Sequence, residues 1–391
     1  MSKYLVICNI YPLPENLGAN IRTMNYVRVF EKLGEVDLAY TGGDAQAGPN
    51  KGIFSKEYHL KQIEYPNDLS GRAYYAVKGL PYPVKLFHGK DKEEIISKIN
   101  HGYYDNVLIR YLHNTGILRE INSEMGKRVI IDVDDVMTDS LYGTLFYETG
   151  NVAKKIKRAI NKILLERFQA DVINGYKTVF CSAVDKRLYA GSLNTAYVIP
   201  NIYENAEMSQ YQFGAGYGNE NILLFVGMLG YAPNVEGLRW FVKTIYKDYS
   251  KIINGVKLLV VGRSPSDDVK NICNSHESIE LHANVDSLIP FYNLARAVVV
   301  PILKGGGTRI KILEAGLTGR PVLSTSMGAY GLDLKDGEEI LLFENSNEFI
   351  KKYKKLESKE YYDQLGKSLR NTVEARFTQK SFEVSFYQMM E

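Results

Sequence analysis

Short apolar runs alternate along the chain with longer segments in which apolar residues recur every three or four positions. The short runs are typical of buried β-strands, and the longer segments are typical of helices that pack one face against a sheet. Strands and helices that alternate in this way form parallel sheets flanked by helices. The pattern therefore predicts an α/β protein.

Both halves of the chain repeat this alternation. In the first half the predicted strands are Tyr4–Ile10, Val36–Tyr40, Asp105–Arg110, Arg128–Asp132, Thr178–Cys181 and Ala196–Ile199, with the clearest helices at Ala19–Leu33 and Lys92–Ile99. In the second half the predicted strands are Ile222–Val226, Lys257–Val261, Ile279–His282, Ala297–Val300, Pro321–Ser324 and Glu339–Phe343, with helices at Val235–Tyr246, Ser287–Leu294 and Arg309–Leu317. We therefore expect two doubly wound, Rossmann-like domains.

A segment between the halves lacks both patterns. Residues 201–221 are rich in Asn, Gly and Tyr and poor in aliphatic periodicity, which is typical of a linker. We place a first domain at residues 1–200 and a second domain at residues 222–378. The last residues, 379–391, contain an amphipathic stretch that predicts a terminal helix, and this helix could cross back to the first domain.

The composition is that of a globular protein. Of the 391 residues 45% are hydrophobic and 24% are charged, and the net charge is +3. A nucleic-acid-binding domain would be strongly basic, so we expect no nucleic acid as a partner. The cysteines Cys8, Cys181 and Cys273 lack metal-ligand or redox spacing, which suits reduced thiols in the cytoplasm. The apolar start, Tyr4–Ile10, is too short for a signal peptide or a membrane span.

The segment PILKGGGTRIKILEAGLTGRP, residues 301–321, follows an apolar strand and opens a helix. Gly305, Gly306 and Gly307 permit positive φ angles and a close approach of the backbone to a ligand. Thr308 can cap the helix and leave amide groups for an anion. A phosphate group could therefore bind here.

Two cations begin this helix. Arg309 and Lys311 lie in its first turn, where the helix dipole disfavours further positive charge, so an anion should compensate them. Glu314 lies one turn after Lys311 on the same side, where a diphosphate and a ribose could bind. The buried stripe of the helix would consist of Ile310, Leu313 and Leu317. The alternative is a surface helix with two solvated cations, because a glycine run by itself is weak evidence of a phosphate site.

Three further segments accompany this one in a fixed order. They are FVGMLGYAPNVEGLRWF at 225–241, VVGR at 260–263 and SMGAYGL at 326–332. With residues 301–321 they resemble the donor-binding domain of GT-B fold glycosyltransferases of family 4, the glycosyl transferases group 1. The resemblance implies two Rossmann-like domains that face each other across a cleft, a nucleoside-diphosphate sugar held by the second domain, and a ribose contact from Glu314. It also implies retention of anomeric configuration.

The first half resembles the family more loosely. Gly18 after the first strand resembles the family's phosphate-side glycine loop, and Ile199-Pro200-Asn201 resembles its interdomain passage. Enzymes of this kind usually need no metal, so the resemblance implies no metal and no cofactor besides the donor substrate. The donor-binding residues are then Gly18, Gly306, Gly307, Thr308, Arg309, Lys311 and Glu314.

The sequence departs from the family at several charged positions. Gly306 stands where the family carries its first glutamate. Met228 stands at the position of an arginine, and Asn234 lies near the position of a lysine. Arg309 and Lys311 are our candidates to supply the missing charge, and through it to stabilise the leaving group in catalysis.

A third departure lies in residues 129–135. Asp134 occupies the place where relatives often carry a histidine close to the sugar. A carboxylate there could contact sugar hydroxyls or act as a general base. Alternatively, Asp132, Asp134 and Asp135 merely cap a turn. A metal site of the Asp-x-Asp type belongs to another glycosyltransferase fold. Arg22 and Arg110 could face the cleft, although a surface role is the default for both. His113 is expected to be structural.

Residues 151–170 predict a helix with a strongly basic surface. Its apolar residues are Ile156, Ile160, Ile163 and Leu164, and its cations are Lys154, Lys155, Lys157, Arg158 and Lys162. Such a helix could rest on an anionic membrane. Alternatively, it is a solvated helix packed on its own core.

Together these features predict a glycosyltransferase that moves a sugar to a hydroxyl group of a glycan or lipid-linked saccharide in cell-surface polysaccharide synthesis. We expect it in the cytoplasm, with the inner face of the cell membrane as a candidate place of action. Two alternatives stay open. One is a sugar-nucleotide epimerase on the same scaffold, and the other is a degenerate, non-catalytic transferase that acts as a scaffold.

Overall fold

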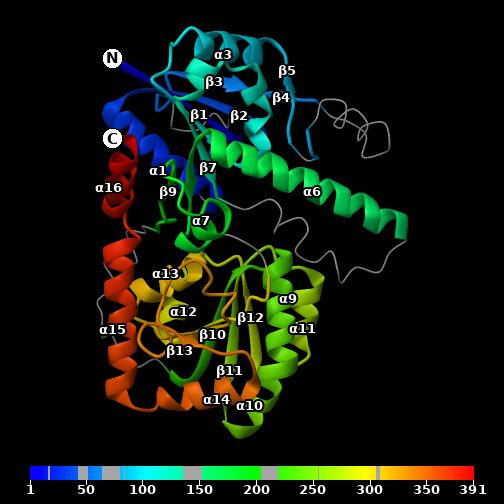
Figure 1. Ribbon diagram of the computed structural model, residues 1–391. Helices are drawn as coiled ribbons and strands as arrows, with labels where there is room; N and C mark the ends of the chain where they lie inside the picture. Colours follow the sequence, from blue (N-terminus) through cyan, green and yellow to red (C-terminus); the bar gives the residue numbers. More distant parts are fainter. Residues whose placement is uncertain are drawn as a thin grey trace. The chain divides into compact units, whose positions relative to one another are not determined.

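The computed structural model describes residues 1–15, 18–42, 52–63, 80–82, 84–134, 152–203, 219–253, 255–304 and 309–391. These residues form two compact units (Figure 1). The first unit contains Met1–Pro200 together with Glu383–Glu391, and the second contains Asn201–Phe382. Each unit has its own parallel sheet and its own hydrophobic core.

The described strands of the first unit form a parallel sheet in the order β3-β2-β1-β6-β7-β8-β9. They are β1 (Ser2–Ile10), β2 (Gly34–Gly42), β3 (Lys56–His59), β6 (Asn106–Arg110), β7 (Val129–Val133), β8 (Lys177–Phe180) and β9 (Ala196–Val198). The chain adds β2 and β3 on one side of β1 and then β6 to β9 on the other. The carboxyl ends of β1 and β6 therefore flank a switch point, where sheets of this type bind ligands.

Helices cover this sheet. They are α1 (Gly18–Leu33), α3 (Lys90–Asn100), the 3₁₀-helix η1 (Leu112–Glu120), α4 (Ser123–Gly126), α6 (Val152–Gly175) and α7 (Ala183–Tyr189). A short antiparallel pair, β4 (Lys61–Gln62) and β5 (Phe87–His88), lies apart from the sheet. The end of α16 (Gln379–Met390) packs beside α1 (Figure 1), because the Phe386 ring lies 5.2 Å from Phe30 and 6.0 Å from Tyr26.

The described strands of the second unit form a parallel sheet in the order β12-β11-β10-β13-β14-β15. They are β10 (Asn219–Met228), β11 (Lys257–Arg263), β12 (Ile279–Ala283), β13 (Ala295–Val300), β14 (Val322–Ser324) and β15 (Leu341–Leu342). The helices are α9 (Ala232–Phe241), the π-helix η2 (Val242–Tyr246), α10 (Lys247–Ile252), α11 (Asp267–Asn274), α12 (Ile289–Leu294), α13 (Ile310–Leu317), α14 (Ser346–Lys355) and α15 (Lys359–Arg376). The switch point of this sheet lies between β10 and β13.

The predicted α/β class and the pair of Rossmann-like units are confirmed. Some boundaries differ. β10 begins at Asn219, inside the segment predicted as a linker, of which residues 204–218 lie outside the described part of the chain. The helix predicted at Val235–Tyr246 begins at Ala232, because a proline in its first turn favours helix entry, and continues to Ile252. β15 contains only Leu341–Leu342, because it pairs with one neighbour at the sheet edge.

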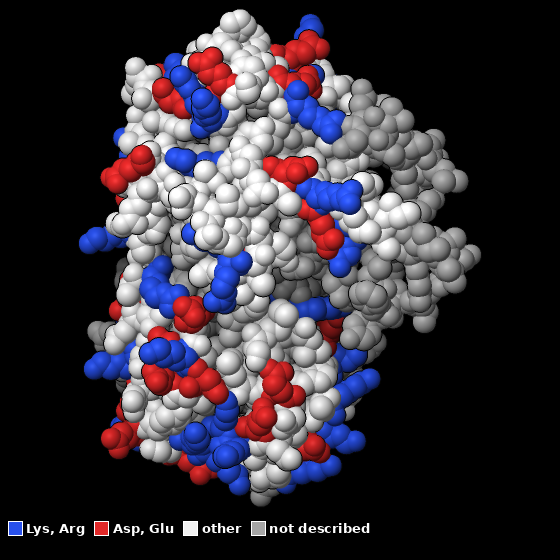
Figure 2. All heavy atoms as spheres, in the orientation of Figure 1, with Lys and Arg blue, Asp and Glu red and all other residues white. Residues whose placement is uncertain are grey.

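Charged side chains of both signs lie interspersed on the face of the molecule shown in Figure 2. This mixture creates no extended field of one sign over the described residues of that face, unlike the surface that a nucleic acid would bind. Within the described residues, no helix is both long enough and apolar enough to cross a membrane.

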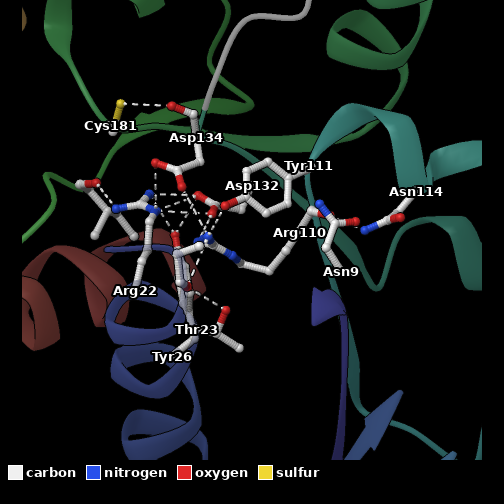
Figure 3. A network of polar contacts seen from close by, with 12 residues as sticks. Asn9, Arg22, Thr23, Tyr26, Arg110, Tyr111, Asn114, Asp132, Asp134 and Cys181 are labelled. Atoms are coloured by element: carbon white, nitrogen blue, oxygen red, sulfur yellow. Dashed lines mark hydrogen bonds and ion pairs between the residues drawn. The ribbon is translucent and has the colours of Figure 1, made fainter. Parts of the chain in front are cut away.

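A buried network of charges fixes α1 against the ends of β6 and β7 (Figure 3). Asp132 in β7 is fully buried, and its carboxylate accepts hydrogen bonds from Arg22 (2.6 Å), Arg110 (2.9 Å) and the Tyr26 hydroxyl group (2.9 Å). Arg22 also donates to the backbone oxygen of Ile199 at 2.9 Å. The network therefore joins α1, β6, β7 and the segment that follows β9.

The two arginines of the network have two carboxylates as partners. Arg110 Nη2 donates to Asp134 Oδ2 at 3.0 Å, and Arg22 Nε lies 3.8 Å from Asp134 Oδ1. Burial by itself would raise the pKa of Asp132, but Arg22 and Arg110 outweigh this effect and hold that pKa below its ordinary value of 3.8. Removing one partner of such a pair leaves a buried charge without compensation.

We predict that Asp132→Asn lowers the free energy of unfolding by about 3–5 kcal/mol, because Arg22 and Arg110 would then share Asp134 alone. Urea unfolding at neutral pH measures this change. The matched control is Asp268→Asn, which removes a carboxylate that is 64% exposed and pairs with Arg239 at 2.7 Å. A surface pair contributes about 0–1 kcal/mol, so the control should unfold almost like the unaltered protein.

The pH dependence gives a second readout of the same network. The folded-state pKa of Asp132 is depressed, so its stabilisation is present above pH 3.8 and is lost as the pH falls further. The Asp132→Asn protein should lack this contribution to acid unfolding. If Asp132→Asn and Asp268→Asn destabilise the protein equally, the network does not hold the unit together.

Candidate active site

The predicted site residues are divided between the two units. Gly18 is the first residue of α1, and Asp134 directly follows β7, so both lie at the carboxyl edge of the first sheet. In the second unit Arg309 directly precedes α13, and Lys311 and Glu314 lie within this helix. The remaining predicted donor ligands, Gly306, Gly307 and Thr308, lie outside the described residues, as does Gly305.

The helix α13 is buried on almost every side, which corrects the prediction of one buried stripe. Ile312, Leu313 and Ala315 are fully buried, whereas Ile310 is only partly so. The helix α15 covers α13 on a further side, since a Cβ atom at Gly316 would lie 2.7 Å from the Val373 side chain. The alternative of a surface helix is therefore wrong.

Glu314 is held inside the second unit by tyrosines. The carboxylate is 8% exposed and accepts a hydrogen bond from the Tyr292 hydroxyl group of α12 at 2.8 Å, and Tyr203 also hydrogen-bonds to it. Burial raises the pKa of Glu314, and the two tyrosines and Lys311 oppose this effect only in part. The carboxylate is thus fixed in position, with lone pairs left for further donors.

Lys311 lies in an environment that disfavours its charge. Its Nζ atom donates to Asn234 Oδ1 at 2.8 Å and lies 5.1 Å from the centre of the Phe225 ring. Among the described residues no carboxylate lies within ion-pairing distance of Lys311. Burial and, to a smaller extent, the charge of Arg309 lower the pKa of Lys311 to about 7, against an opposing effect of Glu314. An anion bound beside Nζ would stabilise the protonated form.

Lys311 lies close to Met228 and Asn234, which stand at or near the places where the family resemblance leads us to expect an arginine and a lysine. The Asn234 side chain donates to the Met228 backbone oxygen at 2.9 Å, so both residues border the carboxyl end of β10. A Cβ atom at Gly227 would lie 3.0 Å from Lys311 Nζ. The ammonium group therefore reaches the segment in which the family resemblance leads one to expect an arginine and a lysine, at the switch point of the second sheet.

At the carboxyl edge of the first sheet, Asp134 is part of the charge network. Its side chain is 13% exposed, Arg110 fixes one carboxylate oxygen at 3.0 Å, and its backbone oxygen accepts from Cys181 Sγ at 3.3 Å (Figure 3). The default of a surface role for Arg22 and Arg110 is wrong, because both are buried ligands of Asp132. Sequence reasoning missed this, since the three residues lie far apart along the chain.

Sequence reasoning also missed a polar cluster at this edge. Lys85, Asn9, Thr41 and His113 come from four separate segments and meet through side-chain hydrogen bonds. Tyr111, next to them, has a left-handed φ of 68°, which is unusual for a side chain of its size and often marks a functional site. No local pattern marks Lys85, because its partners are brought to it only by the sheet.

The described residues contain no group of three or more His, Cys, Asp or Glu side chains that could hold a metal ion. Asp135 of the aspartate segment lies outside the described residues. That the reaction needs no metal stays a prediction.

Comparison with known proteins gives the same fold over the whole chain. A glycosyltransferase from Rickettsia africae is 13% identical with a TM-score of 0.66, covering 100% of this chain and 98% of that one. HepE from Anabaena, solved in complex with UDP, is 11% identical with a TM-score of 0.64, covering 100% and 99%. A protein of Klebsiella pneumoniae, described as an uncharacterized 44.6 kDa protein in the cps region, is 23% identical over 386 residues, 90% of each chain.

The sequence of the second unit carries the family match. Residues 220–359 match the family described as Glycosyl transferases group 1. This range contains the glycine segment and the helix α13 with Arg309, Lys311 and Glu314. The match of residues 220–359 to the glycosyl transferases group 1 and the fold shared with solved GT-B glycosyltransferases together indicate a nucleotide-sugar-dependent glycosyltransferase that resembles family 4.

Proposed function

We propose that the protein transfers a sugar from a nucleoside-diphosphate sugar to a hydroxyl group of a glycan or lipid-linked saccharide, with retention of configuration. The observation that carries this proposal is Lys311, a desolvated cation with a neutral partner at the switch point of the second sheet. The related protein in a cps region supports a role in the synthesis of a cell-surface polysaccharide, and the UDP complex of HepE supports a nucleoside-diphosphate donor. The proposed place of this reaction is the cytoplasm.

Each donor-site residue has a distinct task in this reaction. Lys311 and Arg309 neutralise the diphosphate as its bond to the sugar breaks, assisted by the amide groups at the start of α13. Glu314 accepts hydrogen bonds from the ribose hydroxyl groups. Gly18, at the start of α1, allows the backbone to approach a phosphate group. Leaving-group stabilisation of this kind needs no protein nucleophile and no metal.

We predict that Lys311→Met lowers kcat/KM about tenfold to a hundredfold, because a hydrogen bond to a charged group contributes about 1.5–3 kcal/mol. The melting temperature of the ligand-free protein should not fall, since the variant removes a cation that burial disfavours. Steady-state kinetics and a melting curve on the same protein measure both effects. Arg309→Met should behave in the same way.

The pH profile separates a diphosphate contact from general damage. The pKa of Lys311 is about 7, so donor affinity should weaken as the pH rises above 7 in the unaltered protein and lose this dependence in Lys311→Met. Lys270→Met, at an exposed position of the second unit, controls for loss of a charge. Near-normal kcat/KM in both Lys311→Met and Arg309→Met would refute the donor site. Conversion of the donor to an isomer without an acceptor would indicate an epimerase. Failure to bind any sugar nucleotide would indicate a non-catalytic scaffold.

Asp134 is our candidate for a contact with the transferred sugar or the acceptor. Its carboxylate is partly exposed and is oriented by Arg110 at the carboxyl edge of the first sheet. A carboxylate fixed in this way is well suited to accept a hydrogen bond from a sugar hydroxyl group.

We predict that Asp134→Asn reduces kcat in a protein that still folds, and the size of the loss defines the role. Loss of a charged hydrogen bond should cost about tenfold to a hundredfold, whereas loss of a general base should cost about 10²–10⁴-fold. Unchanged turnover would assign Asp134 a structural role. Far-UV circular dichroism verifies that the variant is folded.

The helix α6 supports contact with an anionic membrane. Ile160, Ile163 and Leu164 are 54%, 49% and 43% exposed, so these three residues are not packed on a core. The packed face of the helix is formed by Leu165, Gln169, Val172 and Ile173. The structure does not describe the side chains of Ile156 and of the predicted cations Lys154, Lys155, Lys157 and Arg158. An apolar stripe on a basic helix favours the inner face of the cell membrane.

We predict that replacing Ile160, Ile163 and Leu164 together by serine abolishes binding to vesicles that contain phosphatidylglycerol, because each buried apolar side chain contributes on the order of 1 kcal/mol. Changing Lys154, Lys155 and Arg158 to Gln should weaken the same binding by about 1 kcal/mol per cation. Vesicle sedimentation measures both. Leu188→Ser, at a residue 64% exposed in the same unit, is the control. Absent or salt-insensitive binding by the unaltered protein would remove the membrane contact.

A further inference from the structure

Four polar side chains of the first unit meet at the carboxyl edge of its sheet without a part in the reaction described above. Asn9 lies near the end of β1 and Thr41 near the end of β2. His113 lies in η1, just after the end of β6, and Lys85 precedes β5. This edge contains the switch point of the sheet, where ligands of doubly wound folds bind.

Lys85 is the centre of this cluster. Its Nζ atom donates to Asn9 Oδ1 and to Thr41 Oγ1, both at 2.9 Å. An ammonium group has three N–H groups, and the described residues accept hydrogen bonds from two of those of Lys85. One N–H group is therefore left to donate to a ligand. Among all the residues that the structure describes, no carboxylate lies within ion-pairing distance of Lys85. The Lys85 side chain is half-buried.

The backbone around Lys85 is fixed. Its amide group donates to the His113 carbonyl oxygen at 2.6 Å, and a Cβ atom at Gly116 would overlap the Lys85 carbonyl oxygen. Thr41 Oγ1 in turn donates to the Asn9 backbone oxygen at 2.8 Å. The ammonium group is therefore held in place before any ligand binds, which reduces the entropy lost on binding.

The neighbours of Lys85 leave its charge without compensation. Burial lowers the pKa of His113 to about 3, with a smaller effect of Lys85, so this histidine is neutral at physiological pH. Its Nε2 atom lies 2.7 Å from Asn9 Oδ1, and its ring stacks on Tyr111 at 5.3 Å. Burial also lowers the pKa of Lys85, to about 8. A cation held by neutral groups is the same arrangement as Lys311 with Asn234 in the second unit.

We propose that Lys85, Asn9 and Thr41 form an anion subsite for the acceptor, which takes a carboxylate or phosphate group carried by the acceptor saccharide. The inference rests on the proposed transfer reaction, since it assigns the first unit to the acceptor. The anion completes the hydrogen bonds of the ammonium group and neutralises it. Two sources share this chemistry, the carboxylate of an acidic sugar and the phosphate that links a saccharide to a lipid.

The test is a binding measurement by isothermal titration calorimetry with three probes. Methyl glucuronide carries a carboxylate, glucose 1-phosphate carries a phosphate, and methyl glucoside is neutral. The unaltered protein should bind at least one anionic probe more tightly than the neutral one. Lys85→Met should weaken that binding about tenfold to a hundredfold and leave the neutral probe unchanged. The anionic probe that shows the loss identifies the source.

Three further variants locate the effect. Lys127→Met, at an exposed residue near the amino end of β7 and thus at the opposite edge of the sheet, should bind like the unaltered protein. Lys85→Arg keeps the charge and should keep the preference for anions. Lys311→Met should also keep it, whereas an anion bound in the donor site would be lost in this variant. If Lys85→Met does not fold, Thr41→Val removes one partner of the ammonium group and should weaken the same probe.

The outcomes distinguish this subsite from the proposed function. Equal binding of anionic and neutral probes by the unaltered protein, or equal binding of the anionic probe by Lys85→Met, overturns the subsite. Donor binding is measured separately with UDP-sugars and should not change in Lys85→Met. Failure of every nucleotide sugar to bind the unaltered protein refutes the proposed function instead, whatever the anion probes show.

Discussion

The buried carboxylate of Asp132 is the constraint on which the first unit depends. Arg22 and Arg110 lose their hydration when the unit folds, and Asp132 compensates both while Arg22 also reaches the Ile199 backbone. A buried ion pair of this kind contributes little net free energy, but a structure that separates its members is strongly disfavoured. The network therefore acts by specifying one arrangement of α1, β6 and β7, and Asp134 takes its orientation from the same arginine.

Each unit combines such fixed charges with a lysine whose charge is left to a ligand. Asp132 and Glu314 are enclosed by donors that hold them in place. Lys311 and Lys85 instead have side-chain amide or hydroxyl oxygens as partners, and burial lowers the pKa of both. Both lie at the carboxyl edge of a parallel sheet, where strand ends and loops leave room for a ligand. Each of these ammonium groups is destabilised in the free protein, and a bound anion would relieve this destabilisation and so bind more tightly.

Patterns of neighbouring residues predicted most of the regular structure. The apolar runs located the described strands of both sheets except β3, because a buried parallel strand needs a continuous apolar sequence and the edge strand β3 has the polar sequence KEYH. The polar helices α7, α11 and α14 were not predicted, because each of them buries at most two residues. The helix α15 was not predicted either, although Tyr362, Leu365, Leu369 and Val373 form a buried stripe at helical spacing. Side-chain caps at Ser182, Ser266, Asn345 and Ser358 mark the starts of these four helices and are a signal that could have found them. No local sequence signal of this kind indicates that α15 packs over α13.

The sequence by itself determined the α/β class, the two sheets, and a helix that begins with Arg309 and Lys311 after a glycine run. These follow from periodicity and from residues adjacent along the chain. Only the tertiary structure decided that Glu314 is buried against Tyr292, that Lys311 faces Asn234, and that Arg22 and Arg110 share Asp132. It also brought Lys85 to Asn9 and Thr41. The physical reason is that burial and charge compensation depend on groups tens of residues apart, which only the packing of strands and helices brings within hydrogen-bonding distance.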